Sequence, residues 1–118
     1  MTDTPKLSVC IPAYDMNGLG ATYLEESFRA LEIQNLTDFE VIVSDQSGNN
    51  EVFELCKAWC KRLTLHHYWN CNGKRQASAN VNYALGKASG EVHKVLFQDD
   101  FILSKTVLQD IVDAFERD

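Results

Sequence analysis

The sequence predicts an α/β fold, with a mostly parallel sheet of about four strands and helices on both of its faces. Short apolar runs alternate along the chain with longer segments whose apolar residues recur every three or four positions. Turn-forming residues separate the two kinds of segment, and no internal repeat or linker divides the chain. We therefore predict a single domain over residues 1–118, in which strands and helices alternate.

Four apolar runs are the predicted strands. They are residues 7–11, 39–44, 63–68 and the stretch 92–101, whose strand runs into two adjacent carboxylates. Pro12 should end the first strand, because proline cannot donate a hydrogen bond to a ladder. Val95, Leu96 and Phe97 are large or β-branched, so we expect the last strand to be buried, as a central strand is.

Four amphipathic segments are the predicted helices. They run from about Thr22 to residues 34–35, over about residues 51–62, over residues 77–88, and onwards from Ser104. Thr22 and Glu25 have the spacing of a capping box, and Ser104 is a candidate cap for the last helix. The buried face of that last helix should hold Leu108, Ile111, Val112 and Phe115.

The composition and the charge exclude several classes of function. The net charge of -6 argues against a nucleic-acid partner, which requires a basic surface, and against docking to anionic lipid. No apolar stretch is long enough for a membrane span, and the N-terminus lacks the apolar core of a signal peptide. The four cysteines form no C-x-x-C pair, so we expect reduced thiols and a cytoplasmic location.

Polar and aromatic residues collect where the predicted strands end. In a parallel sheet all the strands end at one edge, and ligands bind there. That edge should carry the segments 12–15, 45, 70–76 and 98–100. The adjacent carboxylates of Asp99 and Asp100 repel each other, and a divalent cation such as Mg2+ or Mn2+, which prefers hard oxygen ligands, is the simplest reason for them. A solvated acidic turn is the alternative.

Four other residues of this edge each have two interpretations. Tyr14 is either a surface aromatic or a face on which a base stacks. Asp45 either caps the turn that follows it or accepts hydrogen bonds from a base edge or a sugar hydroxyl. Lys74 and Arg75 are either solvated or, in this acidic protein, the partners of a diphosphate.

Four motifs in this order resemble the family-2 glycosyltransferases, which have the Rossmann-like GT-A fold. They are L-S-V-C-I-P-A-Y, F-E-V-I-V-S-D-Q-S, S-A-N-V-N-Y-A-L-G-K-A-S-G-E and V-L-F-Q-D-D-F. The last occupies the place of the family's D-x-D-type metal motif, with Gln98 where the first acid is common. The resemblance extends from Lys6 to about Phe115 and identifies the chain as a nucleotide-sugar-binding half.

The resemblance implies a role for each matching residue. Pro12, Ala13 and Tyr14 would form the turn around the base, and Asp45 would contact that base, most often uracil. Asp99 would lie near the ribose or the outer shell of the metal. Asp100 would bind Mn2+ or Mg2+, which bridges the donor diphosphate and stabilises the leaving nucleoside diphosphate.

The same resemblance leaves the second substrate open. The family continues into strands that bind the acceptor, a saccharide or a lipid-linked molecule, and that supply the general base of inverting transfer. We expect either a missing C-terminal acceptor half or a homo-oligomer that provides it. One alternative is a nucleotide- and metal-binding module without turnover. A receiver or flavodoxin-like signalling domain is a more distant one, because the first strand ends in Pro-Ala-Tyr and not in an acidic pair.

Overall fold

A computed structural model describes residues 4–70, 77–100, 102 and 104–117 of the protein. It confirms the predicted α/β class, because strands and helices alternate along the described chain. The elements in order are β1 (Leu7–Ala13), a 3-10 turn (Met16–Gly18), α1 (Gly20–Glu32), β2 (Phe39–Asp45), α2 (Glu51–Trp59), β3 (Leu65–Trp69), α3 (Ala77–Lys87), β4 (Val92–Val95) and α4 (Val107–Glu116).

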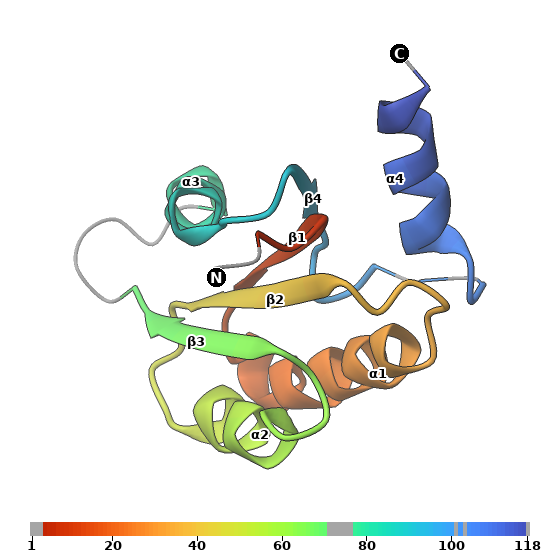
Figure 1. Cartoon of the computed structure of the whole chain (residues 1–118). Coiled ribbons are helices and arrows are strands. Elements are labelled where there is room, and N and C mark those ends of the chain that lie inside the picture. Colours follow the sequence, from red (N-terminus) through yellow and green to blue (C-terminus); the bar gives the residue numbers. More distant parts are fainter. Residues whose placement is uncertain (1–3, 71–76, 101, 103, 118) are drawn as a thin grey trace.

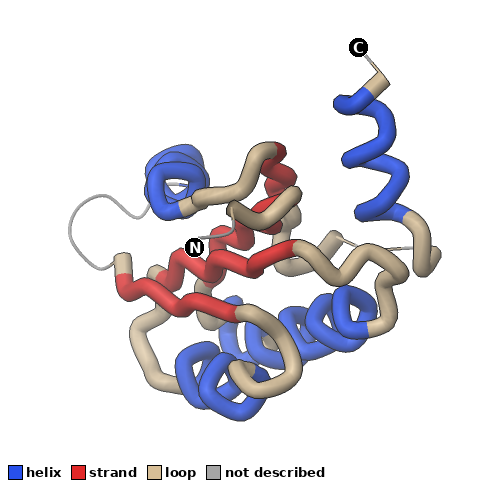
Figure 2. Tube along the Cα trace, viewed as in Figure 1, coloured by secondary structure: helices blue, strands red, loops and turns tan. Residues whose placement is uncertain are grey.

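The four strands form one parallel sheet in the order β3-β2-β1-β4. Helices α1 and α2 lie on one face of this sheet, and α3 lies on the opposite face (Figures 1 and 2). Helix α4 stands to one side of the sheet. Because every strand runs in the same direction, all four carboxyl ends meet at one edge.

The two central strands, β1 and β2, are buried because helices cover the apolar residues on both of their faces. Leu7, Val9 and Ile11 of β1 face α1 and α2, where they join the main core. The rings of Phe28 and Trp59 meet in this core with centroids 5.7 Å apart. On the other face a smaller cluster forms beneath α3, made of Cys10, Ile42 and Ala84. The alternation along β1 and β2 thus sends neighbouring residues to opposite layers.

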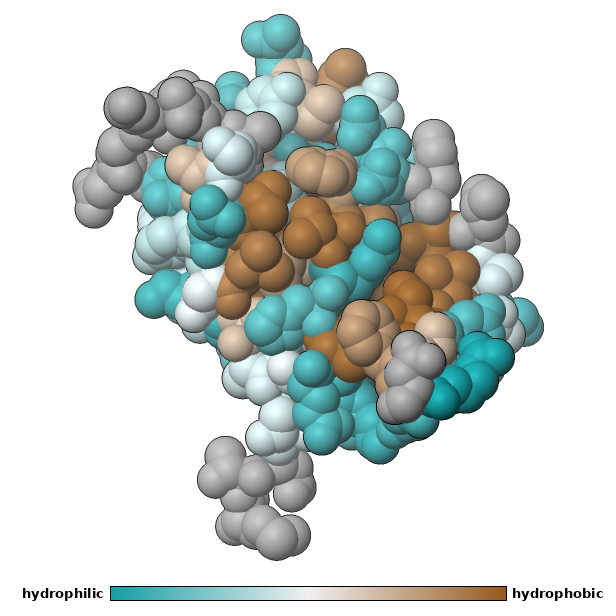
Figure 3. All heavy atoms as spheres, turned by 90° about the horizontal axis from the view of Figure 1, so that it is seen from above, coloured by the Kyte–Doolittle hydropathy of each residue, from teal (hydrophilic) through white to brown (hydrophobic). Residues whose placement is uncertain are grey.

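Helix α3 packs mainly against β1 and β2 on this face of the sheet, and Tyr68 of β3 packs against the small cluster beneath it. Viewed from above, apolar atoms are visible in the middle of this face (Figure 3). Partly buried side chains such as Val92 and Ile111 pack against the rim of the main core. Among the described residues, no helix is long and apolar enough to cross a membrane.

The prediction that Pro12 ends the first strand is wrong. β1 continues through Pro12, which pairs with Ser44 of β2, and ends at Ala13. The carbonyl of Cys10 faces β4, where it accepts a hydrogen bond from Leu96 at 2.9 Å. Pro12 is two residues further and faces the same side, beyond the end of β4. Its missing N–H therefore interrupts no ladder.

The prediction that the last strand is central and buried is also wrong. β4 is an edge strand of four residues that pairs with β1 alone among the described strands. His93 and Lys94 are exposed, and Phe97 lies beyond the strand with 44% of its surface exposed. The apolar run predicted burial, but polar residues on the edge are how sheets limit further pairing.

Two predicted helix caps and one buried position are wrong. α1 begins at Gly20, close to the predicted start near Thr22, but no side chain caps it. The Gly20 N–H instead donates to the carbonyl of Asp15 at 2.9 Å, so the preceding turn serves as the cap. α4 begins at Val107 and not at Ser104, and Phe115 near its end is 64% exposed, because this helix packs on the core through its first turns only.

Buried Glu40 ties β1, β2 and the segment before β4 together at the amino edge of the sheet. Its Oε2 accepts hydrogen bonds from the Ser8 hydroxyl at 2.6 Å and from the Ser89 N–H at 2.8 Å and hydroxyl at 2.9 Å. The Ser8 hydroxyl in turn accepts a bond from the Gly90 N–H at 2.7 Å. Burial alone would raise the pKa of Glu40, but these donors outweigh it and hold the pKa below 4.5.

We expect Glu40→Gln to weaken the acid dependence of stability. A lowered pKa means that Glu40 stabilises the fold above about pH 4.5 and loses this contribution as the pH falls through its folded-state pKa. Urea denaturation from pH 7 to pH 3 should show a smaller fall in the free energy of unfolding for the variant. At pH 7 the variant should be about 2 kcal/mol less stable, since charged hydrogen bonds are replaced by neutral ones. Parallel curves for both proteins would contradict this.

Candidate functional site

The carboxyl edge of the sheet brings together most of the residues that the sequence singled out. Tyr14 follows β1, Asp45 ends β2, and Asn70 follows β3. The turn after β4 holds Gln98, Asp99 and Asp100. Hydrogen bonds join these segments across the sheet. The backbone N–H of Asn70 donates to the Asp45 carbonyl at 2.8 Å, and Gln98 bonds to Tyr14.

Gln98 is the clamp between the ends of β1 and β4. Its Oε1 accepts from the Tyr14 N–H at 2.9 Å, and its Nε2 donates to the carbonyls of Tyr14 and Gly20, each at 3.1 Å. The side chain is buried, so all three bonds are formed away from solvent. An amide is required here because it must accept at one end and donate twice at the other. Gln98 therefore fixes Tyr14 and the start of α1 relative to the two acids that follow it.

Asp45 has no exposed surface, and both of its carboxylate oxygens have donors. The backbone N–H of Ser47 donates to Oδ1 at 2.8 Å, which is the turn-capping role that one interpretation gave it. Oδ2 lies 2.8 Å from Nε2 of His67 on β3. The carboxylate also affects the buried thiol of Cys56. Burial is the larger cause and the negative charge of Asp45 the next, and together they raise the pKa of Cys56 to about 12.

His67 sits in an aromatic cluster beside the end of the sheet. Its ring lies 5.1 Å from that of Phe53 and 4.8 Å from that of Trp69, the latter edge-on at 82°. Lys57 places its ammonium 5.1 Å from the Phe53 centroid. Trp69 is 40% exposed, whereas His67 is almost buried, so the cluster presents its outer member to solvent.

Asn80 in the first turns of α3 braces the same edge from the opposite face. Its Oδ1 accepts from the hydroxyl of Ser44 and from the Asn70 amide at 3.1 Å. Its Nδ2 donates to the Ala13 carbonyl at 3.3 Å. One buried side chain thus links the ends of β1, β2 and β3. The Rossmann-like edge is held rigid by polar contacts where apolar packing stops.

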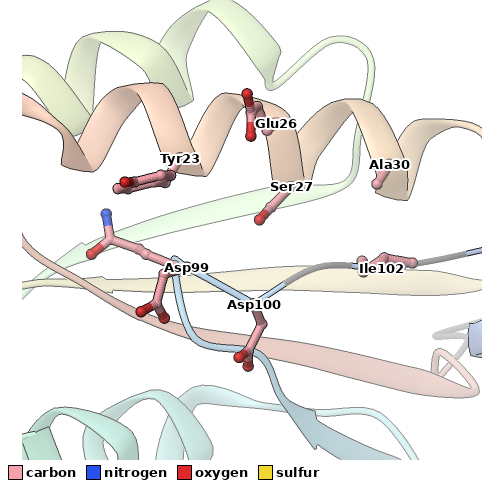
Figure 4. Close-up of a pocket in the computed structure, with 8 residues that line it drawn as sticks. Tyr23, Glu26, Ser27, Ala30, Asp99, Asp100 and Ile102 are labelled. Carbon is pink, nitrogen blue, oxygen red and sulfur yellow. The ribbon is translucent and has the colours of Figure 1, made fainter.

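The two adjacent acids lie in an exposed turn after β4. Oδ2 of Asp100 accepts from the Phe97 N–H at 2.9 Å, and the Asp100 N–H donates back to the Phe97 carbonyl at 2.9 Å. Asp99 has no hydrogen bond or ion pair with any residue that the structure describes. The carboxylates of both acids point away from α1 (Figure 4). This turn presents its carboxylate oxygens at the carboxyl edge of the sheet.

A cavity of about 110 Å³ lies between this turn and α1. Tyr23, Glu26 and Ser27 of α1 line one side of it, and Asp99, Asp100 and Ile102 line the other (Figure 4). Sites for molecules of nucleotide size usually measure about 300–1,000 Å³. This cavity is too small for a nucleotide, so a ligand of that size would lie along the carboxyl edge of the sheet.

The carboxylate oxygens of Asp99 and Asp100 fit a hard divalent cation whose remaining coordination positions are filled by a bound ligand and water. In the described part of the chain, no group of three or more His, Cys, Asp or Glu side chains could hold a metal alone. Mg2+ commonly takes only one or two protein carboxylates and completes its shell with substrate phosphates and water. The Asp99 carboxylate, which has no partner among the described residues, and the remaining oxygen of Asp100 satisfy that requirement.

The other predicted site residues differ in how much of their surface a ligand could reach. Pro12 and Ala13 are buried within β1, so the turn begins at Tyr14 and these two side chains face no open surface. Tyr14 is 51% exposed and is free to stack. Lys74 and Arg75 lie outside the described residues.

The sequence reasoning missed His67 and Asn80. The sequence did contain a signal for His67. Alternation along β3 places residues 65, 67 and 69 on one face, and strand pairing places that face beside Asp45. Asn80 carried no such signal, because an asparagine in the first turn of a predicted helix is usually solvated.

Comparison with known proteins gives one consistent family. The family model of Glycosyl transferase family 2 matches residues 8–118. A curated relative, the GalNAc(5)-diNAcBac-PP-undecaprenol beta-1,3-glucosyltransferase of Campylobacter jejuni, is 32% identical over 101 residues. That match covers 85% of this chain but 31% of the relative, so the chain spans about a third of that protein's length.

Solved structures share the fold. S. aureus TarS 1-349 in complex with UDP superimposes with a TM-score of 0.81 at 26% identity, over 95% of this chain and 32% of that one. The same protein with UDP-GlcNAc gives 0.79 at 26% identity, over 95% and 31% of the two chains. The mannosyltransferase PcManGT from Pyrobaculum calidifontis, in complex with GDP-Man and Mn2+, gives 0.76 at 22% identity, over 98% and 32%, which is a likeness of fold.

Proposed function

This chain belongs to Glycosyl transferase family 2, and from that premise we propose that it binds a nucleoside diphosphate sugar, with UDP-sugars favoured, as the donor of a glycosyl transfer. The observation that carries the proposal is the convergence of Tyr14, Asp45 and the Asp99-Asp100 turn on one edge of a parallel sheet. The crystal structures of TarS with UDP and UDP-GlcNAc support the choice of nucleotide.

The base would bind at the β1 and β2 end of this edge. Tyr14 offers an exposed ring for stacking, and Asp45 offers carboxylate acceptors for a donor on the base edge. The backbone after Ala13 would form the turn around the base, with Pro12 and Ala13 as its buried support. Because Asp45 has no exposed surface, base binding requires a neighbouring group to move.

The diphosphate would bind at the β4 end. Asp100 is the proposed direct ligand of Mn2+ or Mg2+, and Asp99 supports that ion or contacts the ribose. The ion would neutralise the diphosphate and stabilise the leaving nucleoside diphosphate. In a chain with a net charge of -6, such neutralisation offsets the repulsion between the acidic site and the anionic donor. Lys74 and Arg75 are proposed as additional partners of the phosphates.

The acceptor is proposed to be a saccharide or a lipid-linked saccharide, with inversion at the transferred carbon. The name of the C. jejuni relative supports a lipid-linked acceptor. The open edge of β4 is where an acceptor-binding part, or a second copy of the chain, would add its strand.

The free thiols of Cys10, Cys56 and Cys60 support a cytoplasmic setting.

Calorimetric titration of UDP with and without Mn2+ tests the proposal. We expect binding that depends on Mn2+ and that weakens about a hundredfold in Asp100→Asn, since the substitution removes an anionic ligand of the cation. Asparagine keeps an acceptor for the Phe97 N–H, so the turn itself should persist. Hydrolysis of UDP-GlcNAc in the presence of Mn2+ would then separate a working donor site from a binding module without turnover.

Asp113→Asn is the matched control, because Asp113 is an exposed acid on α4 away from this edge. It should leave UDP affinity unchanged. If the folded wild-type chain binds UDP equally well with and without Mn2+, the metal assignment is wrong. If it binds no nucleotide, the donor-site proposal is wrong as a whole.

A further inference from the structure

A second cavity lies at the amino edge of the sheet, at the opposite end of the strands from the proposed donor site (Figure 1). Its volume is about 320 Å³, which reaches the lower end of the range for small-molecule sites. Phe39 and Glu40 of β2 and His66 of β3 line it, together with Asp38 and Thr64 from the loops that precede these strands. The cavity therefore has room for a ligand of a few non-hydrogen atoms.

Glu40 is the buried charged group of this cavity. Its side chain is 7% exposed, whereas Asp38, Thr64 and His66 are exposed. Burial opposes its ionisation, but the three hydrogen bonds that Oε2 accepts outweigh burial and lower the pKa of the carboxyl, so the group is charged at neutral pH. Oε1 has no hydrogen bond to any residue that the structure describes. Oε1 is thus the oxygen that remains for a ligand.

The surroundings of Glu40 supply no full counter-ion. The groups that donate to Oε2 are two hydroxyls and a backbone N–H, all of them neutral. Nε2 of His66 lies 3.7 Å from Oε1, which is too long for a hydrogen bond. Asp38 adds a second carboxylate to the lining, and neither a lysine nor an arginine is among the described lining residues. A cation in this cavity would offset the cost of the buried charge.

We propose that the cavity binds the primary ammonium group of a small organic amine, with Oε1 of Glu40 as its anionic acceptor. An ammonium carries three N–H donors, and the Thr64 hydroxyl and the Asp38 carboxylate are further acceptors in the lining. Phe39 supplies an apolar wall for a short alkyl chain. A divalent metal ion fits less well, because within the described ranges no group of three or more His, Cys, Asp or Glu side chains could hold one. This site goes beyond the proposed function, since it takes a different ligand at the other edge of the sheet.

Butylamine, which carries an ammonium group at pH 7, is the probe for this site. Titration of the 15N-labelled chain at constant ionic strength, followed by NMR, locates binding through the amide shifts. We expect shift changes at residues 38–40, 64–66 and 89, with a Kd of about 1 mM for so small a ligand. 1-Butanol has the same chain without the charge, and it should bind at least about tenfold more weakly.

His66→Lys tests the charge requirement without removing a buried group. His66 is exposed on an edge strand, so the variant should fold, and its new ammonium lies beside Glu40. We expect it to weaken butylamine binding at least about tenfold, because the chain then supplies the cation itself. Thr22→Lys adds the same charge at an exposed position of α1 and should keep the wild-type Kd. Glu40→Gln, with its folding checked by circular dichroism, should also lose binding.

Several results would overturn the assignment. Shift changes confined to Asp99 and Asp100 would place the amine at the acids of the donor site. Equal affinities for butylamine and 1-butanol would show that the cavity does not recognise the charge. Wild-type affinity in His66→Lys, or in folded Glu40→Gln, would remove Glu40 from the site, and the absence of any shift change would remove the site altogether. Each of these results leaves the proposed function standing, because UDP binding is measured in a separate titration.

Discussion

Gln98→Glu is expected to destabilise the protein by about 4 kcal/mol, although the two side chains have the same shape. The substitution turns the donor that faces the carbonyls of Tyr14 and Gly20, each 3.1 Å away, into a third acceptor. It also places a negative charge in a buried position. Chemical denaturation at pH 7 measures the loss as a fall in the midpoint.

The effect should be confined to the buried amide. Gln109→Glu on α4 replaces an amide whose only described bond is to Asp113, at 2.9 Å, and should cost no more than about 0.5 kcal/mol. Gln98→Ala should lie between the two variants in stability and should weaken UDP binding, because Tyr14 loses its tie to the acidic turn. Equal stabilities of Gln98→Glu and wild type would show that the amide does not clamp the two strand ends.

Gly20→Ala is expected to cost about 3–5 kcal/mol of stability. A β-carbon at Gly20 would collide with the carbonyl oxygen of Tyr14 and would lie 3.0 Å from the carbonyl of Asp15. Both neighbours are backbone atoms of the tight segment before α1, so neither can rotate away as a side chain does. Thermal unfolding should show a midpoint at least 10 °C lower, on the scale of about 4 °C per kcal/mol for a domain of this size.

Gly86→Ala is the matched control, since it makes the same change inside α3. Apart from its own helical backbone and its chain neighbours, no atom of the described residues lies within 4 Å of the added carbon there, and alanine is the better helix former. It should therefore stabilise the protein by about 0.5–1 kcal/mol. If both variants unfold at the wild-type temperature, the close approach of α1 to the β1 turn is wrong.

The sequence predicted the fold well where periodicity alone decides it. The apolar runs located all four described strands, and the alternation of strands and helices predicted the parallel sheet. It failed where a neighbour decides the outcome. Pro12 remains in β1 because β4 has already ended beside it, and Phe97 is exposed because β4 ends at Val95 and Phe97 lies in the turn that follows. Strand order is a long-range property that no local window contains.

The site was predictable at the level of its edge and less so at the level of its contacts. Topology alone placed Tyr14, Asp45 and the two acids together. The partners that hold them, His67, Asn80 and Gln98, act through their hydrogen-bond geometry, and single residue types do not reveal that geometry. Asn and Gln in particular have both donors and acceptors, so their buried role depends on three-dimensional neighbours.

The strand order also sets when the site can form during synthesis. β1 is made before the other described strands, yet on one side it pairs with β4, so that Leu7 cannot pair there until Val92 has been synthesised. At roughly 5–20 residues per second, one side of β1 stays unpaired on the ribosome for several seconds. The clamp by Gln98 follows only after β4. Pairings this distant in sequence slow folding, so the nascent chain carries an open, apolar strand edge that invites chaperones or aggregation.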